Sequence, residues 1–241
     1  YEYHTLVIIM SPIIVNREEK TRLIVRVALK LFSQKGYHAT SVSRIAKGAD
    51  IGKGTIYGYF ATKEEIFLAA IREWSAQLWR RIAGKTEGIE DPVRQFYAVA
   101  ETMADIGDPD DLESMRLIYE VMQQTMVKNG VLFKKRHLVK KILVESRQMV
   151  VDILLDGISK GLFRPEIAKD AEKIAVNFLA FLDGVGLHSL VSENYLNLKE
   201  QMDYYLCHLL RMVLKKPFLK EYTLNDPKIR SEKSAFSPFN L

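Results

Sequence analysis

Apolar residues recur every three or four positions along almost the whole chain of 241 residues, and this helical spacing restricts the fold more than any other feature. No run alternates like a half-buried strand, and no internal repeat competes. The pattern therefore predicts an all-α protein. Gly36 is a good residue to end the first helix, and the Asp-Pro pairs at 91–92 and 108–109 suit the starts of two later ones. The predicted helices cover residues 17–35, 40–49, 53–60, a long segment from 63, 92–106, 110–127, 132–160, 170–192 and 197–216.

The stretch GADIGKGTIYGYF, residues 48–60, holds a lysine between two glycines and raises the question of a phosphate-binding loop. A Walker loop requires a glycine five positions before its Gly-Lys pair and a Ser or Thr after it. Those positions hold Lys47 and Gly54 instead. A Walker loop also follows a strand, whereas the preceding residues here, 41–49, carry the apolar stripe of a helix. The sequence therefore disfavours nucleotide binding here.

Two helices around a tight turn explain the same stretch better. The first helix begins near Ser41, a good N-cap residue, and ends in the turn 49–52. Asp50 falls where the chain reverses, and Asp tolerates the left-handed conformation that such turns often need. The second helix, 53–60, keeps Ile56 inward, which indicates a helix-turn-helix unit. The residues offered outward or sideways are Lys53, Thr55, Tyr57 and Tyr59.

A capping box then opens the next helix, with Thr62 at the N-cap and Glu65 three residues later. The whole run from residue 28 to 67 resembles the amino-terminal domain of the tetracycline-repressor (TetR/AcrR) family of transcription regulators. In that family a first helix ends in F-x-x-x-G-Y/F, and a recognition helix reads K-G-T-hydrophobe-Tyr-x-Tyr-Phe. A lysine then starts the fourth helix. The matching residues are Phe32, Gly36, Tyr37, Thr40, Val42, Ile45, Ala46, Lys53, Gly54, Thr55, Ile56, Tyr57, Tyr59, Phe60 and Lys63.

The resemblance implies an all-α architecture in which a three-helix helix-turn-helix domain, 17–64, is joined through a long fourth helix to a helical effector-binding and dimerisation domain, 65–216. It implies a homodimer that binds an inverted-repeat operator in double-stranded DNA. A ligand-responsive repressor is the expected function, and an enzyme is not. The alternatives left open are a helical protein-protein adaptor and an enzyme whose active site follows no known motif.

The same resemblance assigns roles on the DNA. Lys53, Gly54 and Thr55 are expected to approach base edges. This chain departs from the family at Asp50, Gly52 and Gly58, where the family usually has a turn glycine, a capping serine and a side chain that often reaches the DNA. With fewer groups to read bases, specificity is expected to depend partly on DNA shape. The residues expected to hold phosphates are Ser41, Arg44, Tyr57, Tyr59 and Lys63.

Charge is distributed unevenly along the chain. Residues 17–85 carry 14 Lys and Arg against 6 Asp and Glu, whereas the remainder carries 21 against 24. A positive segment beside a neutral to acidic one is the pattern of a phosphate-binding domain with a partner domain. A second basic cluster, 134–141, is interpreted as a solvated helix start, and an anion site or a second duplex contact is the alternative.

Methionines and aromatic residues gather on the middle helices. Such stripes usually belong to an ordinary core, because methionine fills irregular gaps. The family resemblance implies instead a deformable apolar cavity for a largely apolar small-molecule effector. The candidate lining residues are Phe96, Met103, Tyr119, Met122, Arg147 and Phe178.

The last two helices are too apolar for surface helices and need burial on more than one side. An ordinary core is one interpretation. The resemblance implies another, a four-helix bundle formed by the last two helices of two chains. The candidate dimer-interface residues are Phe181, Gly184, His188, Met202, Leu206, Leu209 and Val213.

Several remaining features bear on function class and location. The five histidines show no metal-ligand spacing with carboxylates or with the single Cys207, so neither a metal nor a cofactor is expected. One cysteine suits a reducing cytoplasm, and no uninterrupted apolar run reaches the roughly 18 residues of a membrane helix. Residues 1–16 are expected to be an extension, non-native before Met10. Residues 217–241 are expected to form a poorly ordered tail.

Overall fold

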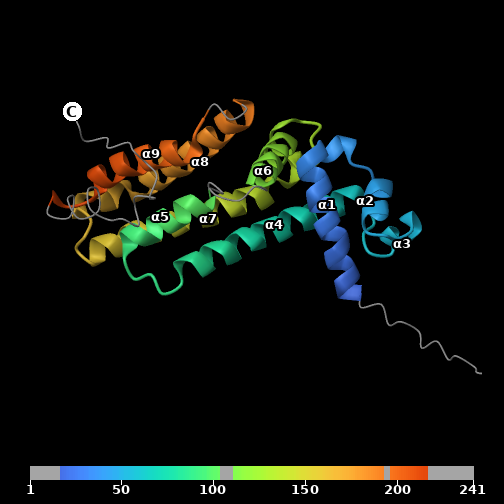
Figure 1. Ribbon diagram of the computed structural model, residues 1–241, viewed down its shortest axis with the longest axis horizontal. Coiled ribbons are helices and arrows are strands. Elements are labelled where there is room, and N and C mark those ends of the chain that lie inside the picture. Colours follow the sequence, from blue (N-terminus) through green and yellow to red (C-terminus); the bar gives the residue numbers. More distant parts are fainter. Residues whose placement is uncertain (1–16, 104–110, 193–195, 217–241) are drawn as a thin grey trace, which may run out of the picture.

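The computed structural model describes residues 17–103, 111–192 and 196–216, which form helices and their connections with one isolated β-bridge. The predicted all-α class is confirmed. Predictions for residues 1–16, 108–109 and 217–241 lie outside the described residues. In Figure 1, α1 to α3 gather at one end, α4 runs away from them, and α8 and α9 lie on the opposite side. The helices are α1 (Arg17–Ala39), α2 (Val42–Gly48), α3 (Lys53–Tyr57), α4 (Lys63–Thr86), α5 (Pro92–Met103), α6 (Asp111–Met126), α7 (Arg136–Ser159), α8 (Ala171–Val191) and α9 (Leu198–Val213), with 3₁₀ turns η1 (Phe133–Lys135) and η2 (Pro165–Asp170).

The amino-terminal helices close around an aromatic cluster. The Phe32 ring centroid lies 4.8 Å from that of Phe67 and 5.8 Å from that of Tyr37. Gly36 breaks the helical backbone with a φ of 73°, as predicted for the end of the first helix, and this turns Tyr37 back onto the cluster. Leu117 of α6 is buried in the same core. A helix from outside the predicted DNA-binding segment 17–64 therefore completes the amino-terminal domain.

The long helix α4 connects this core to a second one. Its first turns bury Ile66 and Phe67 in the amino-terminal core, and its later turns bury Leu78 and Ile82 in the other. Residues of α5, α7, α8 and α9 complete the second core. Because one continuous helix contributes to both cores, a shift of α4 must disturb packing at both ends.

The predicted caps are confirmed at two helix starts. The Glu65 amide donates to Thr62 Oγ1 over 3.1 Å, and Glu65 Oε2 accepts from the Ala61 amide over 2.8 Å. The box thus closes on the residue before the N-cap rather than on the N-cap itself. At α5, the Val93 amide donates to Asp91 Oδ1 over 2.8 Å, directly before the predicted proline start.

Later helices are shorter at some ends than the pattern predicts. The turns η1 and η2 replace the expected first residues of the helices 132–160 and 170–192. Helix α9 ends at Val213 rather than at 216, because Leu214 turns to extended backbone and forms a β-bridge with Phe163. The Arg164 amide donates to the Val213 carbonyl over 2.9 Å at this bridge. The carboxyl end of α9 is thereby tied to the connection between α7 and α8.

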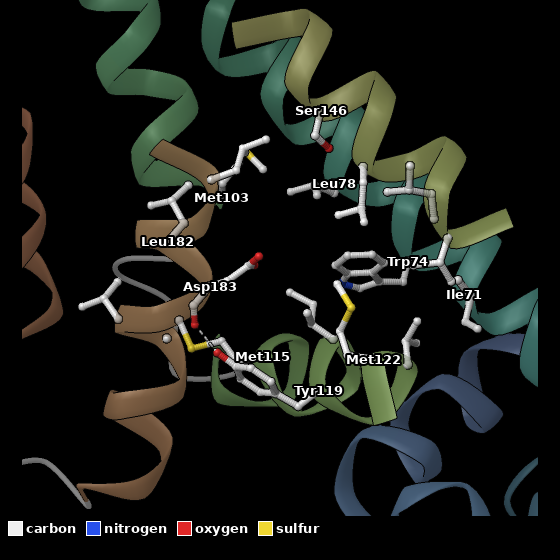
Figure 2. A pocket seen from close by; sticks show the side chains of 18 of the residues that line it. Ile71, Trp74, Leu78, Met103, Met115, Tyr119, Met122, Ser146, Leu182 and Asp183 are labelled. Atoms are coloured by element: carbon white, nitrogen blue, oxygen red, sulfur yellow. Dashed lines mark hydrogen bonds between the residues drawn. The ribbon is translucent and has the colours of Figure 1, made fainter. Parts of the chain in front are cut away.

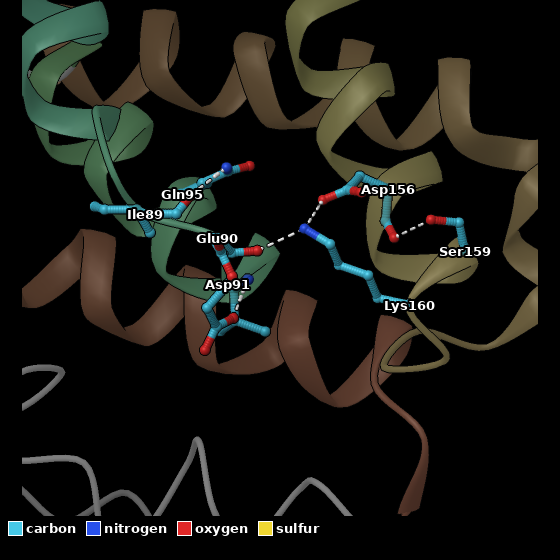
Figure 3. Close-up of polar contacts among 8 residues, drawn as sticks. Ile89, Glu90, Asp91, Gln95, Asp156, Ser159 and Lys160 are labelled. Atoms are coloured by element: carbon cyan, nitrogen blue, oxygen red, sulfur yellow. Dashed lines mark hydrogen bonds and ion pairs between the residues drawn. The ribbon is translucent and has the colours of Figure 1, made fainter.

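A lysine at the end of α7 holds the loop between α4 and α5 (Figure 3). Lys160 Nζ donates to the Glu90 carbonyl over 2.6 Å and pairs with Asp156 over 2.7 Å. In the same loop, Gln95 Nε2 donates to the Ile89 carbonyl over 2.5 Å. These contacts fix the start of α5 against α7.

Gly157 on α7 is expected to be intolerant of any side chain. A Cβ atom there would lie 2.2 Å from the buried ring of Phe163. We expect Gly157→Ala to lower the free energy of unfolding by about 1–3 kcal/mol, because the core must shift to admit it. The control is Gly84→Ala on α4, where a Cβ meets nothing within 4 Å and where alanine should stabilise by about 0.5–1 kcal/mol. Urea denaturation measures both variants, and equal effects would contradict the packing argument.

One helical stretch, Pro165–Val191, is long and apolar enough to cross a membrane by length and composition alone. Within the fold, α8 is apolar on two sides. Ile174 and Phe178 face the core, while Leu187 and Val191 are 47% and 74% exposed. Within the described part of the chain, the outer side of α8 therefore remains an uncovered apolar surface.

Candidate nucleic-acid interface and ligand cavity

Helices α2 and α3 form the predicted helix-turn-helix. The Arg44 amide donates to Ser41 Oγ over 3.2 Å, so Ser41 caps α2 as expected. The chain reverses at Asp50, whose φ is 51°, which confirms the predicted left-handed turn. The Ile51 amide closes the turn on the Ala46 carbonyl over 3.1 Å. The Arg44 guanidinium donates to the Ala39 carbonyl over 3.0 Å and stays exposed beside the start of α2.

The recognition helix α3 is shorter than predicted, spanning Lys53–Tyr57 rather than 53–60. Gly52 gives its start no side-chain cap, and Gly58 follows its end. Ile56 is fully buried and fastens the helix to the domain. The residues that α3 leaves exposed are Lys53, Gly54, Thr55 and Tyr57, which are four of the residues predicted to meet DNA.

Tyr59 lies beyond α3 and is half-buried, which corrects its predicted place on the recognition helix. The guanidinium of Arg17 lies over its ring, 5.3 Å from the centroid. Arg17 also donates to the Gly58 carbonyl over 2.8 Å. Tyr59 and Arg17 thus join the start of α1 to the end of the recognition helix. Sequence reasoning missed Arg17, because nothing in its local pattern indicates a partner 41 positions away.

Lys63 is turned toward the protein rather than offered to a phosphate. Its ammonium donates to the carbonyls of Tyr37 over 2.9 Å and of Thr40 over 3.1 Å, and it lies 4.1 Å from the centre of the Tyr37 ring. Burial lowers the pKa of this ammonium, and the negative charge of Glu120 opposes that shift. The position predicted for a phosphate contact therefore serves to connect α4 to the end of α1.

Lys63→Ala is accordingly expected to act on stability first. Its removal leaves two carbonyls that face the interior without their donor, which costs about 1–3 kcal/mol of unfolding free energy. Lys53→Ala is the matched control, since that exposed lysine should change stability by no more than about 0.5 kcal/mol. Guanidinium denaturation followed by circular dichroism compares the two. An unchanged midpoint for Lys63→Ala would return Lys63 to the list of phosphate contacts.

An apolar cavity of about 100 Å³ lies between α4, α6, α7 and α8 (Figure 2). Met103 at the end of α5 contributes to its wall, and so do Tyr119 and Met122 of α6. These are three of the six predicted lining residues. The other lining residues are Ile71, Trp74, Leu78, Arg81, Met115, Ile118, Val121, Val139, Ile142, Leu143, Ser146, Leu179, Leu182, Asp183, Val185 and Gly186.

The remaining three predicted lining residues do not line this cavity, and their assignment is corrected. Phe96 and Phe178 pack on each other with ring centroids 4.7 Å apart, and both are buried in the second core. Arg147 is half-buried on α7, outside the cavity wall. The two phenylalanines fill space instead of bordering it, which is the ordinary core interpretation of such stripes.

Two polar side chains meet at the cavity wall between α6 and α8. The Tyr119 hydroxyl donates to the backbone carbonyl of Asp183. Burial, and secondarily the charge of Asp183, raise the pKa of Tyr119 to about 12. Burial also raises the pKa of the Asp183 carboxyl. Sequence reasoning missed Asp183, although an acidic residue inside the apolar run FLAFLDGVG is a signal that was open to it.

The expected dimer surface needs a correction on α9. Met202, Leu206, Leu209 and Val213 are all buried within their own chain, because this face of α9 packs against the second core. Phe181 is half-buried and stacks on Tyr205, with 3.9 Å between ring centroids. Of the prediction, His188 is exposed and Gly184 is half-buried. The other exposed residues on these two helices include Val176, Leu187, Val191, Tyr204, His208 and Met212.

Metal chemistry finds no support in the described part of the chain. No group of three or more His, Cys, Asp or Glu side chains there lies close enough to hold a metal ion.

Comparison with known proteins relates the amino-terminal helices to a known family. Residues 24–70 match the family described as bacterial regulatory proteins, tetR family. The chain is 36% identical over 146 residues to the HTH-type transcriptional regulator YuxN of Bacillus subtilis, covering 59% of this chain and 47% of that relative. It is 26% identical over 147 residues to the HTH-type transcriptional repressor KstR2 of Mycobacterium tuberculosis, covering 61% of this chain and 70% of KstR2.

The fold is shared over a longer stretch than the sequence. A transcriptional regulator from Saccharomonospora viridis, solved in complex with choline, superposes with a TM-score of 0.72 at 20% identity. That superposition covers 83% of this chain and all of the other. The helix-turn-helix geometry and the family match lead to one conclusion: residues 24–70 are a DNA-binding domain of the tetR family of bacterial regulatory proteins, and the chain is a DNA-binding transcription regulator rather than an enzyme.

Proposed function

We propose that this protein is a homodimeric repressor that binds an inverted-repeat operator and leaves it when an apolar small molecule fills the cavity between α4, α6, α7 and α8. The observation that carries the proposal is the exposed face of α3, with Lys53, Thr55 and Tyr57 turned outward around the buried Ile56. A related protein, KstR2, is named a repressor. A regulator of bacterial genes acts where the chromosome lies, which is the cytoplasm.

The DNA contacts follow from which groups are exposed. Lys53, Gly54 and Thr55 at the start of α3 are placed to approach base edges, with Gly54 allowing close approach of the backbone. Tyr57 and Arg44 remain available for phosphates, as does the amide end of α2 near Ser41. Lys63 and Tyr59 are left out of this set, because each is engaged within the domain.

A second copy of the chain is the proposed cover for the outer apolar side of α8. Val176, Gly184, Leu187 and Val191 follow one another along that helix at helical spacing, and Tyr204 of α9 is exposed as well. Gly184 has no neighbour within 4 Å of a would-be Cβ, so a partner backbone has room to approach. A two-fold pair would present two recognition helices to successive major grooves, about 34–36 Å apart.

The cavity and the DNA-binding domain share helix α6. One side of α6 lines the cavity through Tyr119 and Met122. Its neighbour Glu120 accepts a hydrogen bond from the Tyr37 amide over 2.9 Å, at the kinked end of α1. A cavity of about 100 Å³ is smaller than the roughly 300 Å³ or more of typical ligand sites, so a ligand must displace its wall. Displacement of α6 would then reach α1 directly.

Release of DNA needs only modest coupling. A ligand that binds better when α6 is displaced shifts the population toward dimers whose recognition helices no longer match the half-sites. A hundredfold loss of operator affinity corresponds to about 2.7 kcal/mol of coupling.

The test is selection of binding sites from random duplex DNA with the full chain at near-physiological salt, since non-specific affinity varies steeply with salt. Light scattering on the same sample gives the mass of the DNA-free protein. Enrichment of an inverted repeat by a protein with the mass of two chains supports the proposal. Enrichment of no sequence by the folded protein would overturn it, and a single-chain mass would overturn its dimeric part.

A further inference from the structure

The cavity wall contains one acidic side chain, Asp183, among mainly apolar neighbours. Figure 2 shows its carboxyl group directed into the open space between α6 and α8 on one side and Trp74 of α4 on the other. Burial raises the pKa of this carboxyl, and among the described residues no cation forms an ion pair with it. Asp183 is itself an exposed residue, so its carboxylate borders the cavity from a position that water still reaches.

The only basic side chain among the described lining residues does not supply a cationic partner for Asp183. Arg81 contributes to the wall, but it is an exposed residue and forms no ion pair with Asp183. The shift in the Asp183 pKa has burial as its cause, with no contribution from Arg81. Within the described residues, the cavity therefore has one acidic edge that no cation neutralises.

The wall around Asp183 is fixed by specific contacts. The Tyr119 hydroxyl donates a hydrogen bond to the backbone carbonyl of Asp183, which holds the tyrosine side chain beside this acidic residue. Gly186 permits this arrangement, because a Cβ there would lie 3.2 Å from the Tyr119 hydroxyl oxygen and 3.6 Å from Met115 Sδ. Across the cavity, the indole nitrogen of Trp74 is buried and has no hydrogen-bond partner among the residues that the structure describes. The site thus combines an anion, two aromatic side chains and an unused donor.

These groups select for charge as well as for shape. An ammonium group next to a carboxylate gains a charge-assisted hydrogen bond, and aromatic faces add cation–π attraction. A neutral head group leaves the carboxylate without a counter-charge, and a carboxylate head would meet like charge. An oxygen acceptor on the body of the ligand would satisfy the Trp74 nitrogen. The methionines Met103, Met115 and Met122 can rearrange around an apolar body.

We propose that the cavity binds an amphiphilic amine, with an ammonium group at Asp183 and an apolar body among the methionines and Trp74. This assignment rests on the proposed ligand-responsive function and names the chemical class of its effector. It distinguishes this site from one for fatty acids or other anions.

The experiment uses Trp74 as the reporter. The chain has two tryptophans, so Trp79→Phe leaves Trp74 as the single indole, and its emission reports cavity occupancy in the full-length protein. Octylammonium, octanol and octanoate share one apolar chain and differ in head-group charge. We expect octylammonium to bind at least about tenfold more tightly than the other two. Equal or tighter binding of octanol or octanoate, or no binding of any probe, would overturn the assignment.

Two variants in the same background sharpen the result. Asp183→Asn keeps the shape and removes the charge, so the affinity for octylammonium should fall about tenfold while that for octanol stays the same. Asp156→Asn removes an acid that pairs with Lys160 outside the cavity and should change neither affinity. An unchanged preference for octylammonium in Asp183→Asn would contradict the role of this carboxylate. If Asp183→Asn fails to fold, the ranking of the three probes with Asp183 intact still decides.

Failure of this assignment is separable from failure of the proposed function. Operator binding by the same proteins is measured without any probe. Operator binding together with a preference for octanol or octanoate would reject the amine and keep the regulator. A preference for octylammonium in a protein that selects no DNA sequence would keep the amine site and reject the proposed regulator.

Discussion

Replacing Lys53 and Tyr57 together with alanine is expected to lower operator affinity by at least about a hundredfold. Both side chains are exposed on α3, and Tyr57 is 50% exposed, so their contacts are available to DNA and contribute little to the folded domain. A good base contact by Lys53 is worth about 1–3 kcal/mol, and its loss in both half-sites, together with the phosphate contacts of Tyr57, exceeds the roughly 2.7 kcal/mol of a hundredfold change. Fluorescence anisotropy with the selected operator measures the loss.

The unfolding midpoint separates this effect from a general loss of structure. Because neither side chain is buried, the double variant should unfold within about 0.5 kcal/mol of the wild type. Lys85→Ala, at the far end of α4, removes the same charge away from α3 and serves as the control. The salt dependence adds detail, since loss of a phosphate contact reduces the slope by about one, whereas loss of a base contact does not. Equal losses for Lys85→Ala and the double variant would show that charge alone, not α3, governs binding.

Glu120→Ala is expected to separate the cavity from the DNA-binding domain. The carboxylate accepts hydrogen bonds from the Tyr37 amide and from Gln124, each over 2.9 Å. A Cβ on Gly36 would lie only 2.7 Å from its other oxygen, so it sits directly against the kink of α1. Its loss leaves the Tyr37 amide without its acceptor, which costs about 1–3 kcal/mol of unfolding free energy.

The coupling itself can be measured without knowing the effector. Linkage is reciprocal, so operator binding must change the affinity of the cavity for its ligand by the same factor by which that ligand changes operator affinity. In the Trp79→Phe background, we expect operator to change Trp74 emission, and we expect that change to fall at least severalfold in Glu120→Ala. Glu120→Gln retains an amide oxygen for the Tyr37 amide and should keep most of the response. Glu145→Ala, which removes an exposed partner of Lys141, should keep all of it. A full response in Glu120→Ala would exclude this contact as the route.

The features that sequence predicted well are set by neighbours within a few positions. Asp50 takes the left-handed conformation because the chain reverses over four residues, and Thr62 and Glu65 form their cap within one turn. Gly36 ends the regular part of α1 for the same local reason. Residue type and spacing carry that information directly. The helix-turn-helix and the order of helices could therefore be predicted from sequence.

The features that sequence could not predict depend on partners far along the chain. Lys63 reaches carbonyls 23 and 26 positions earlier, and no local pattern shows that its ammonium turns inward. Helix α9 presents one apolar stripe, and only packing decides whether its own core or a second chain covers it; Leu206, fully buried, belongs to the core. Phe96 and Met103 share a helix, yet one fills the core and the other borders the cavity. Hydrophobicity is the same signal in both cases.

The recognition helix has one further consequence for how an operator is found. It is five residues long, begins without a side-chain cap and is fastened by Ile56 alone among its residues. So short a helix has little stability of its own, and contacts with matching bases would complete its order. A mismatched sequence then binds more weakly for two reasons. The base contact is missing, and α3 stays partly unfolded. On such a sequence only phosphate contacts hold the protein, so it leaves quickly. The incomplete order of α3 therefore makes the search along DNA fast and the final recognition selective.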